Sequence, residues 1–301
     1  MTILVAGGTG FLGSRIIDDL LGMTEQKASV RCMTRNTDRP SPWAQQVELV
    51  GGDVRNEASL DEATRGVEVV IHTVQFPNHP VEVPRRGYTY MEIDAEGTRR
   101  MVNAAAANGV RRFIYLSGAG ASSTSDKSWF RAKAIAEEAV RESGMEYVIL
   151  RPSWVYGPED RSLNKLITLT KTLPFVPVIG DGTSRIQPVS VFDVATVAAL
   201  AVGLEEATNR LFELGGPEVL TMDEVLLTVQ RLLGVKRRLI HHPVGFMKLA
   251  TVPFQLLPTP PMTPQAVEFV TGEALVDPQP TEETFGIRFM SLEEGLRKYL
   301  A

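Results

Sequence analysis

The stretch ILVAGGTGFLG, residues 3–13, decides the fold, because a short apolar run leads directly into closely spaced glycines. Gly8, Gly10 and Gly13 satisfy the pattern G-x-G-x-x-G, while Gly7, Gly10 and Gly13 satisfy the wider G-x-x-G-x-x-G. Glycine lets the backbone approach a pyrophosphate without Cβ atoms in the way, and the following helix offers free N–H groups. The alternative is a plain tight turn, which the position between a strand and a helix disfavours. The expected cofactor contacts are Gly7, Gly8, Thr9, Gly10, Phe11, Leu12 and Gly13.

Short β-branched runs alternate with helical patterns through the first half of the chain. This alternation predicts parallel strands joined by right-handed crossovers, and continuous apolar runs suit strands that are covered on both faces. We therefore expect an α/β fold of the Rossmann type, with a doubly wound parallel sheet. The periodicity predicts strands at residues 3–6, 29–33, 47–50, 67–72 and 112–117, and helices at 11–21, 59–65 and 94–108.

Capping signals mark the ends of several helices. A serine or threonine followed three residues later by glutamate predicts helix starts at Ser59, Thr221 and Ser291. Gly66 and Gly234 are suitable helix ends.

The regular alternation weakens after Arg151, where proline becomes frequent. We expect residues 1–150 to form an NAD(P)-binding domain. Residues 151–301 should form mainly a smaller substrate lobe over the carboxyl edge of the sheet, where ligands of open α/β sheets bind.

The composition excludes several classes of function. The chain has 301 residues and a net charge of -5, which gives no basic footprint for nucleic acid. A single cysteine, Cys32, rules out an intramolecular disulfide and a thiol zinc cluster. The N-terminus lacks the pattern of a signal peptide, and the longest aliphatic run, residues 194–204, is too short to span a bilayer. We therefore expect a cytoplasmic protein.

The end of the second predicted strand bears on which dinucleotide binds. A ribose 2′-hydroxyl is usually held by an acid about 20 residues past the glycines, whereas a 2′-phosphate requires arginine. Here that place holds Thr34 and Arg35, with Arg31 inside the strand. A guanidinium can make two parallel hydrogen bonds to a phosphate, so NADP(H) is favoured over NAD(H). An ordinary surface role for Arg35 is the alternative, and Arg15 in the first helix could add to the positive field or simply be exposed.

Two further strand ends supply candidate cofactor contacts. Asp53 and Val54 follow the third strand, where Asp53 is expected to meet the adenine ring or to serve as an ordinary turn residue. Thr73 and Val74 close the fourth strand, where the backbone would face the ribose of the cofactor.

With these pieces the chain resembles the short-chain dehydrogenase/reductase superfamily, in its extended and atypical branches. The matching stretches are VAGGTGFLG, GGDVRN, VVIHTV, MEIDAEGT, RFIYLSGAG, SWFRAKA, RPSWVYGP and IQPVSVFDVA. The C-terminal stretches PPMTPQAVEF and ETFGIRF look most like the subgroup with the accessory NADPH-binding subunit of respiratory complex I and its bacterial relatives.

The resemblance implies roles for individual residues. Ser117 corresponds to the serine that orients the substrate oxygen, and Lys133 to the lysine that holds the nicotinamide ribose. RPSWVYGP, with Pro152, looks like the segment that passes below the nicotinamide, and residues of about 185–200 like an element that returns to the nucleotide-binding domain. Family members transfer the proton with a tyrosine four residues before the lysine, but this position is Trp129.

Trp129 decides whether ordinary catalysis is available, because an indole N–H does not ionise in the useful range. The pattern places Trp129, Lys133 and Glu137 on a different helix stripe from the apolar residues. Lys133 should therefore face the cofactor, with a solvated surface lysine as the alternative. Three accounts remain: cofactor binding without catalysis, a reductase whose proton comes from Lys133, or a displaced phenol. The candidate phenols are Tyr88, Tyr90, Tyr115 and Tyr156.

The remaining signals concern histidines and an apolar segment. His72 is expected to be a core histidine, and the adjacent His241 and His242 would make a poor metal pair, so no metal site is expected. Residues 243–262 are largely apolar and could line a hydrophobic substrate pocket, contact a membrane or protein partner, or form a lid packed on their own lobe.

Together these patterns predict an NADP(H)-binding, atypical short-chain dehydrogenase/reductase. The expected activity is that of a reductase-like or epimerase-like oxidoreductase, weak or unusual, on a small carbonyl or enone compound of apolar character. The competing class is a non-catalytic NADP(H)-binding accessory subunit or redox sensor.

Overall fold

The computed structural model describes residues 1–23, 28–38, 42–77 and 79–300. Its centre is a seven-stranded sheet in the order β3-β2-β1-β4-β5-β6-β11, in which all neighbouring strands are parallel. The order reverses between β1 and β4, which makes the expected doubly wound Rossmann sheet. The strands are β1 Thr2–Ala6, β2 Ser29–Thr34, β3 Val47–Gly51, β4 Val69–His72, β5 Arg112–Leu116, β6 Glu146–Pro152 and β11 Arg210–Leu214.

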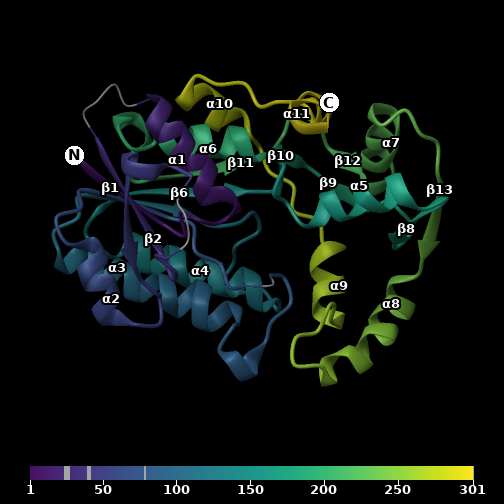
Figure 1. Ribbon diagram of the computed structural model, residues 1–301, viewed down its shortest axis with the longest axis horizontal. Helices are drawn as coiled ribbons and strands as arrows, with labels where there is room; N and C mark the ends of the chain where they lie inside the picture. Colours follow the sequence, from purple (N-terminus) through teal and green to yellow (C-terminus); the bar gives the residue numbers. More distant parts are fainter. Residues whose placement is uncertain (24–27, 39–41, 78, 301) are drawn as a thin grey trace.

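Helices cover both faces of this sheet (Figure 1). On one face α1 packs against α6, and their apolar residues share a core with β1 and β6. On the other face α2, α3 and α4 enclose a second core. The covered faces explain why the strands are continuously apolar. The bounds are α1 Phe11–Met23, α2 Glu57–Thr64, α3 Gly97–Ala107, α4 Ser128–Arg141 and α6 Val191–Leu200.

Two helix starts differ from the sequence prediction. Helix α2 begins at Glu57 rather than at the predicted Ser59, because the side chain of Asn56 accepts the Ser59 N–H and caps the helix. The helix predicted over residues 94–108 begins earlier, as a π-helical turn, η3 Tyr90–Glu96, that continues into α3. The capping boxes at Thr221 and Ser291 are confirmed.

The strand prediction missed β6 and β11, which form the edge of the sheet beyond β5. Strand β6 runs to Pro152, and β11 pairs with it from a part of the chain assigned by sequence to the second half. Helix α10, Gln279–Phe285, contacts β11. The second half of the chain therefore contributes a strand and covering helices to the nucleotide-binding sheet.

The remaining elements build a smaller lobe beside the carboxyl edge of the sheet (Figure 1). It contains three two-stranded pairs, β7 with β10, β9 with β12 and β8 with β13, and helices α5, α7 and α11. The bounds are β7 Trp154–Tyr156, α5 Ser162–Thr172, β8 Phe175–Ile179, β9 Arg185–Ile186, β10 Pro188–Ser190, η4 Glu205–Ala207, β12 Leu220–Thr221, α7 Met222–Leu232, β13 Arg238–His242 and α11 Leu292–Leu300.

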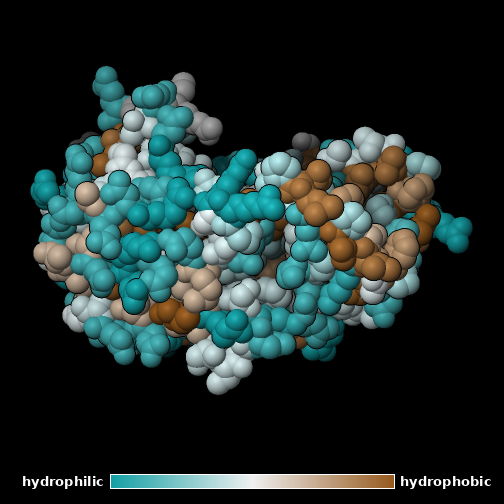
Figure 2. All heavy atoms as spheres, turned by 90° about the horizontal axis from the view of Figure 1, so that it is seen from below, coloured by the Kyte–Doolittle hydropathy of each residue, from teal (hydrophilic) through white to brown (hydrophobic). Residues whose placement is uncertain are grey.

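The apolar segment of residues 243–262 forms α8 Val244–Thr251 and the 3-10 turn η5 Val252–Leu256, followed by α9 Pro264–Val270. Helix α8 packs on α9. Most large apolar side chains of the segment nevertheless point into solvent, and Figure 2 shows a hydrophobic patch over this part of the lower face. The segment is therefore not a lid with its apolar side chains packed on its own lobe. Within the described residues, no helix has the length and apolar character needed to cross a membrane.

Candidate cofactor and active site

The glycine loop between β1 and α1 leaves no room for side chains. Gly7 adopts a φ of 82°, in the left-handed region that favours glycine. A Cβ on Gly13 would overlap the Gly7 carbonyl oxygen and lie 2.8 Å from Gly8 Cα. The first N–H groups of α1 have no intrahelical acceptor. The loop therefore has the bare backbone and helix start that fit a pyrophosphate.

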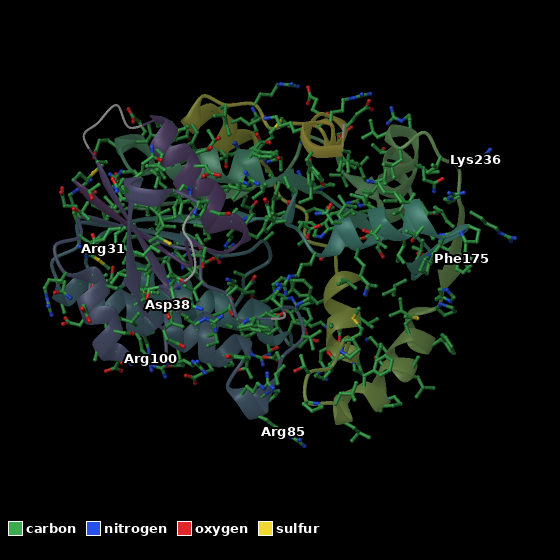
Figure 3. The ribbon with its side chains drawn as sticks, in the orientation of Figure 1. Arg31, Asp38, Arg85, Arg100, Phe175 and Lys236 are labelled. Carbon is green, nitrogen blue, oxygen red and sulfur yellow. The ribbon has the colours of Figure 1, made fainter. Side chains whose placement is uncertain are left out.

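The end of β2 provides the groups expected to discriminate between dinucleotides. Thr34 Oγ1 lies 3.3 Å from Thr9 Oγ1, which joins the strand end to the glycine loop. Arg35 is exposed and makes no ion pair with another described residue, so its guanidinium is free for a phosphate. Arg31 is committed elsewhere: Figure 3 places it in the nucleotide-binding half, where it binds Glu48 at 2.9 Å and backbone carbonyls.

Arg15 does not project freely over the loop. It forms ion pairs with Glu159 and, at 3.5 Å, with Asp18, and it lies over the ring of Phe192. Arg15 therefore links α1 to the second half of the chain.

Asp53 and Val54 follow β3. The Asp53 side chain is half-buried, and the Val54 side chain is buried. Arg55 binds both carboxylate oxygens of Asp53, at 3.0 and 2.7 Å, and this hydrogen bonding lowers the pKa of Asp53. The Val54 side chain is buried under Gly97 in the core, so only its backbone is placed to meet a ligand.

Parallel register brings the other strand ends to the same edge. Ala6 pairs with Met33 on one side and with His72 on the other, and His72 pairs in turn with Tyr115. Thr73 donates from its hydroxyl to the Ala6 carbonyl at 2.9 Å, beside Gly7.

Further along this edge lie Val74, which packs partly against the core, and Ser117. Buried Pro152 accepts the Ala119 N–H at 2.9 Å. The glycine loop, the ends of β2 and β4, and the ends of β5 and β6 thus lie along one edge of the sheet.

Helix α4 carries the residues expected to act on the substrate. Trp129 is only 8% exposed, and Glu137 is 1% exposed. The sequence placed these residues on a different stripe from the apolar residues, and the structure shows that this second stripe is largely buried as well. The Lys133 side chain is 11% exposed, so it is not a solvated surface lysine.

Lys133 ends in a buried polar cluster that the sequence did not single out. Its ammonium lies 2.9 Å from Asp94 Oδ1 and 5.4 Å from the centre of the Tyr115 ring. Burial opposes the charge, but Asp94 and Tyr115 outweigh it and raise the pKa of Lys133. Burial likewise raises the pKa of Asp94, against the effect of Lys133. Asp94 lies within the matched stretch MEIDAEGT, which was its only sequence signal.

Ser117 is engaged in a second buried cluster. Its hydroxyl donates to Glu137 Oε1 at 2.6 Å. Arg151 binds both oxygens of the same carboxylate, each at 2.7 Å, and Arg141 approaches it at 2.9 Å. A fully buried glutamate is thus neutralised by two arginines and one hydroxyl. Glu137 was placed on the lysine stripe by the sequence, but its partners Ser117 and Arg151 come from outside helix α4.

The four candidate phenols occupy different environments. Tyr156 donates to the Ser291 carbonyl at 3.2 Å in the core of the smaller lobe, and Tyr88 lies under the Arg55 guanidinium. Tyr115 is fully buried beside Lys133, and burial raises its pKa to about 12. Tyr90 lines a cavity.

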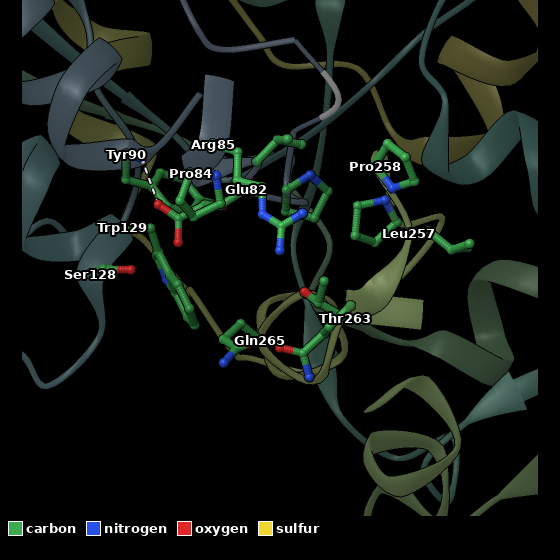
Figure 4. A pocket seen from close by; sticks show the side chains of 14 residues that line it. Glu82, Pro84, Arg85, Tyr90, Ser128, Trp129, Leu257, Pro258, Thr263 and Gln265 are labelled. Carbon is green, nitrogen blue, oxygen red and sulfur yellow. Dashed lines mark hydrogen bonds between the residues drawn. The ribbon is translucent and has the colours of Figure 1, made fainter. Parts of the chain in front are cut away.

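This cavity has a volume of about 230 Å³ and lies between η3, α4 and the segment after α8 (Figure 4). Trp129 forms one wall, so the indole borders the space rather than filling it. The Tyr90 hydroxyl is buried and has no hydrogen-bond partner among the described residues. Burial, then Asp94 and Glu82, raises the pKa of Tyr90, which stays protonated at neutral pH. Leu257 and Pro258 close the opposite wall.

Aromatic rings join this wall to the smaller lobe. Phe269 of α9 lies edge-on to Trp129, with ring centres 5.3 Å apart, and edge-on to His79 at 4.9 Å. Burial lowers the pKa of His79 to about 3, so the ring is neutral and supplies no proton at neutral pH.

The other histidines play structural parts. His72 is fully buried, lies 3.1 Å from the Thr98 hydroxyl, and has its pKa lowered to about 3 by burial. His241 pairs with Asp223 at 3.0 Å. The described part of the chain contains no group of three or more side chains arranged to hold a metal ion.

A family model described as NAD(P)H-binding matches residues 7–202, well over half of the chain. The chain belongs to this NAD(P)H-binding family. The match covers the glycine loop, the strand ends and helix α4 together.

Individual relatives extend the comparison. NADH dehydrogenase [ubiquinone] 1 alpha subcomplex subunit 9 of Arabidopsis thaliana is 31% identical over 83% of this chain, which spans 62% of that protein. A ceramide reductase of Caulobacter vibrioides is 29% identical over 80% of this chain and 73% of its own length. The expected resemblance to the complex I subunit is confirmed.

The fold also agrees with solved structures. The NADPH-dependent quinone oxidoreductase QOR2 of Escherichia coli, in complex with NADPH, superposes with a TM-score of 0.75. The match covers 99% of this chain and 100% of that chain at 20% identity, and it supports the fold alone.

Proposed function

We propose that this family member binds NADP(H) in preference to NAD(H). The support is Arg35, an exposed cation directly after β2 that makes no ion pair with another described residue, next in the chain to Thr34, which contacts Thr9. No acidic side chain follows β2 at the place where a 2′-hydroxyl would be held. Backbone groups of residues 7–13, 53–54 and 73–74 would hold the rest of the cofactor, and Lys133 and Pro152 would lie by the nicotinamide ribose.

We further infer that the chain is a slow reductase of a small apolar carbonyl or enone compound. The observation that carries this inference is Tyr90, which lines the cavity beside Trp129 and whose buried hydroxyl has no hydrogen-bond partner among the described residues, so that a small shift of the ring would bring its O–H to a bound substrate. A bound reduced nicotinamide supplies the hydride to the substrate carbon. As the hydride adds to the carbon, the π electrons of the C=O bond move to the oxygen. Tyr90 donates its proton to that oxygen and becomes a phenolate. After the product leaves, the Tyr90 phenolate regains its proton from water that enters the cavity, while Lys133 and Asp94 keep their ion pair.

The remaining side chains position the substrate. Trp129 and the prolines of the cavity exclude water and favour a flat apolar compound. A phenol with a raised pKa is a weaker acid than one beside an ammonium, so slow turnover is expected. Ser117 has its hydroxyl turned to Glu137 and would orient the substrate only after releasing that bond.

The test is NADPH oxidation with benzaldehyde, cyclohexenone and benzoquinone as substrates. We expect Tyr90→Phe to lower kcat by about 10²–10⁴ while NADPH affinity is unchanged. Trp129→Tyr should restore turnover in the Tyr90→Phe background, because it returns a phenol to the turn before Lys133. Tyr88→Phe, on the far side of Arg55, is the matched control and should not change the rate.

A second candidate is a non-catalytic NADP(H)-binding subunit. The engaged Ser117 hydroxyl and Trp129 favour it, as does the likeness to a subunit of NADH dehydrogenase. Tight NADPH binding with no oxidation by any of these compounds, even in Trp129→Tyr, would establish it over the reductase.

The proposal also covers the compartment, the domain division and the partners of the chain. We place the chain in a reducing compartment such as the cytoplasm, supported by one buried cysteine, Cys32, whose pKa burial raises to about 11. We also propose that residues 1–150 form a nucleotide-binding domain and that residues 151–301 form mainly a substrate lobe, with α6, β11 and α10 returning to the first domain. A protein or membrane partner for residues 243–262 is supported by their exposed apolar side chains.

A further inference from the structure

The segment from α8 to the end of η5 exposes a row of large apolar side chains, which we call the apolar lip. Leu249 is 71% exposed and Leu256 is 85% exposed. These side chains belong to a short helix and a proline-containing turn, and Figure 2 shows a hydrophobic patch over this part of the lower face. Exposed apolar surface of this extent marks an interaction site. The apolar lip comprises Phe246, Leu249, Val252, Phe254, Leu256 and Leu257.

The charge around the apolar lip differs in sign from the rest of the chain. Between Glu224 and Glu268 there is no acidic residue, but there are five cations. The rest of the chain holds 26 of the 31 lysines and arginines and all 36 acids, a net charge of -10. The segment is thus positive in a negative protein. The five cations are Arg231, Lys236, Arg237, Arg238 and Lys248.

Several cations lie at the ends of the apolar lip without acidic partners. Strand register places Arg238 beside the exposed Phe175, at the outer end of the lobe near Lys236 (Figure 3). Near the other end of the apolar lip, Arg85 projects outward from the lower edge of the molecule in Figure 3. Arg85 and Leu257 both line the cavity. Lys236, Arg238 and Arg85 make no ion pair with another described residue. The apolar side chains are therefore bordered by free positive charge.

The apolar lip is continuous with the mouth of the cavity. Leu257 belongs to both, and Gln255 and Pro258 on either side of it also line the cavity. An apolar compound at the apolar lip would therefore reach first the cavity wall formed by Leu257 and Pro258, which lies opposite Trp129 (Figure 4).

We propose that the apolar lip docks this chain on the surface of an anionic lipid bilayer. Exposed apolar side chains suit the acyl boundary, and surrounding lysines and arginines suit anionic headgroups. The lip would rest on the surface without spanning it. A membrane-dissolved, amphiphilic carbonyl compound would then reach the cavity directly. That substrate class rests on the proposed reductase function, whereas the docking does not.

The test is flotation of the full chain with vesicles of phosphatidylcholine alone and with phosphatidylglycerol added, without cofactor or substrate. We expect binding to the mixed vesicles to exceed binding to the neutral ones by about tenfold, and to weaken in high salt. Leu249→Ser with Leu256→Ser, neither of which lines the cavity, should lower it about tenfold. Lys236→Glu with Arg238→Glu should remove the preference for anionic lipid.

Leu227→Ser is the matched control, since Leu227 of α7 is 54% exposed outside the apolar lip. It should bind vesicles like the unaltered chain. No binding to mixed vesicles, or equal binding by the lip variant, would overturn the docking. A dimer in size-exclusion chromatography that only the lip variant abolishes would assign the lip to a second copy and also overturn it. Since no turnover is measured, failure here leaves the Tyr90 test standing.

Discussion

Arg35 and Lys133 are two cations near the carboxyl edge of the sheet that differ in their ion-pair partners. Both are cations that the sequence places at the cofactor. Arg35 keeps its charge free, whereas Lys133 is compensated by Asp94 before any ligand arrives. The role of Arg35 can be tested by measuring dinucleotide affinity, and the role of Lys133 by measuring the free energy of unfolding.

Arg35→Ala should weaken NADPH binding by about 10- to 100-fold and leave NADH binding nearly unchanged, because only NADPH carries the 2′-phosphate. Isothermal titration with both dinucleotides measures the difference. Arg65→Ala, which removes an exposed arginine paired with Asp61, should change neither affinity. Equal losses for both dinucleotides would remove the assignment of Arg35 to the phosphate.

Lys133→Met should destabilise the chain by about 3–5 kcal/mol, because it leaves the buried Asp94 carboxylate without a partner. Adding Asp94→Leu should restore most of the loss, since neither charge is then buried. Urea unfolding of the single and double variants gives the two free energies. Additive losses in the double variant would show that the two groups do not act as a pair.

At the scale of elements, the turn from β1 into α1 and the start of α6 each depend on one residue. The turn excludes any side chain at Gly13, while Gly22 later in α1 faces open space. The first turn of α6 holds Asp193, whose carboxylate accepts the Met290 N–H at 2.9 Å.

Gly13→Ala should abolish NADPH binding and lower stability, because the new Cβ would overlap the backbone of Gly7 and Gly8. Gly22→Ala, in the same helix, should raise stability by about 0.5–1 kcal/mol and leave binding unchanged. Thermal unfolding and NADPH titration of both variants separate the two effects. A Gly13→Ala variant that binds NADPH normally would exclude the loop as the pyrophosphate site.

Asp193 should make stability depend on pH. Burial raises its pKa to about 6, from an ordinary 3.8, so its favourable contribution is complete below the ordinary pKa and is lost as pH rises through about 6. Asp193→Asn should therefore be more stable than the unaltered chain near pH 8, by up to about 3 kcal/mol, and equal to it near pH 4. Melting temperatures across this range provide the measurement. A constant difference at every pH would contradict it.

At the scale of the whole molecule, the sequence predicted the sheet more completely than the contacts between side chains at the strand ends. The glycine pattern and the alternation of strands and helices are local signals, and they placed five strands and the main binding loop. Strand β11 was missed because its pairing with β6 comes from a distant part of the chain. The Asp94–Lys133 and Ser117–Glu137 contacts were missed for the same reason.

The sequence analysis gave a pocket lined by residues 243–262 as one alternative, but it did not predict the other walls of the cavity, because residues 80–85, η3 and α4 are distant from that segment in the chain. The exposure of residues 243–262 could not be predicted either, because an apolar run has the same sequence pattern whether its side chains are packed or face solvent.

The most direct measurement is hydrogen–deuterium exchange over the whole chain, with and without NADPH. We expect NADPH to slow exchange in peptides that cover the glycine loop, the ends of β2 and β4, and the start of α4, with a weaker effect from NADH. Unchanged exchange at the glycine loop, with either dinucleotide at saturating concentration, would contradict the proposed site.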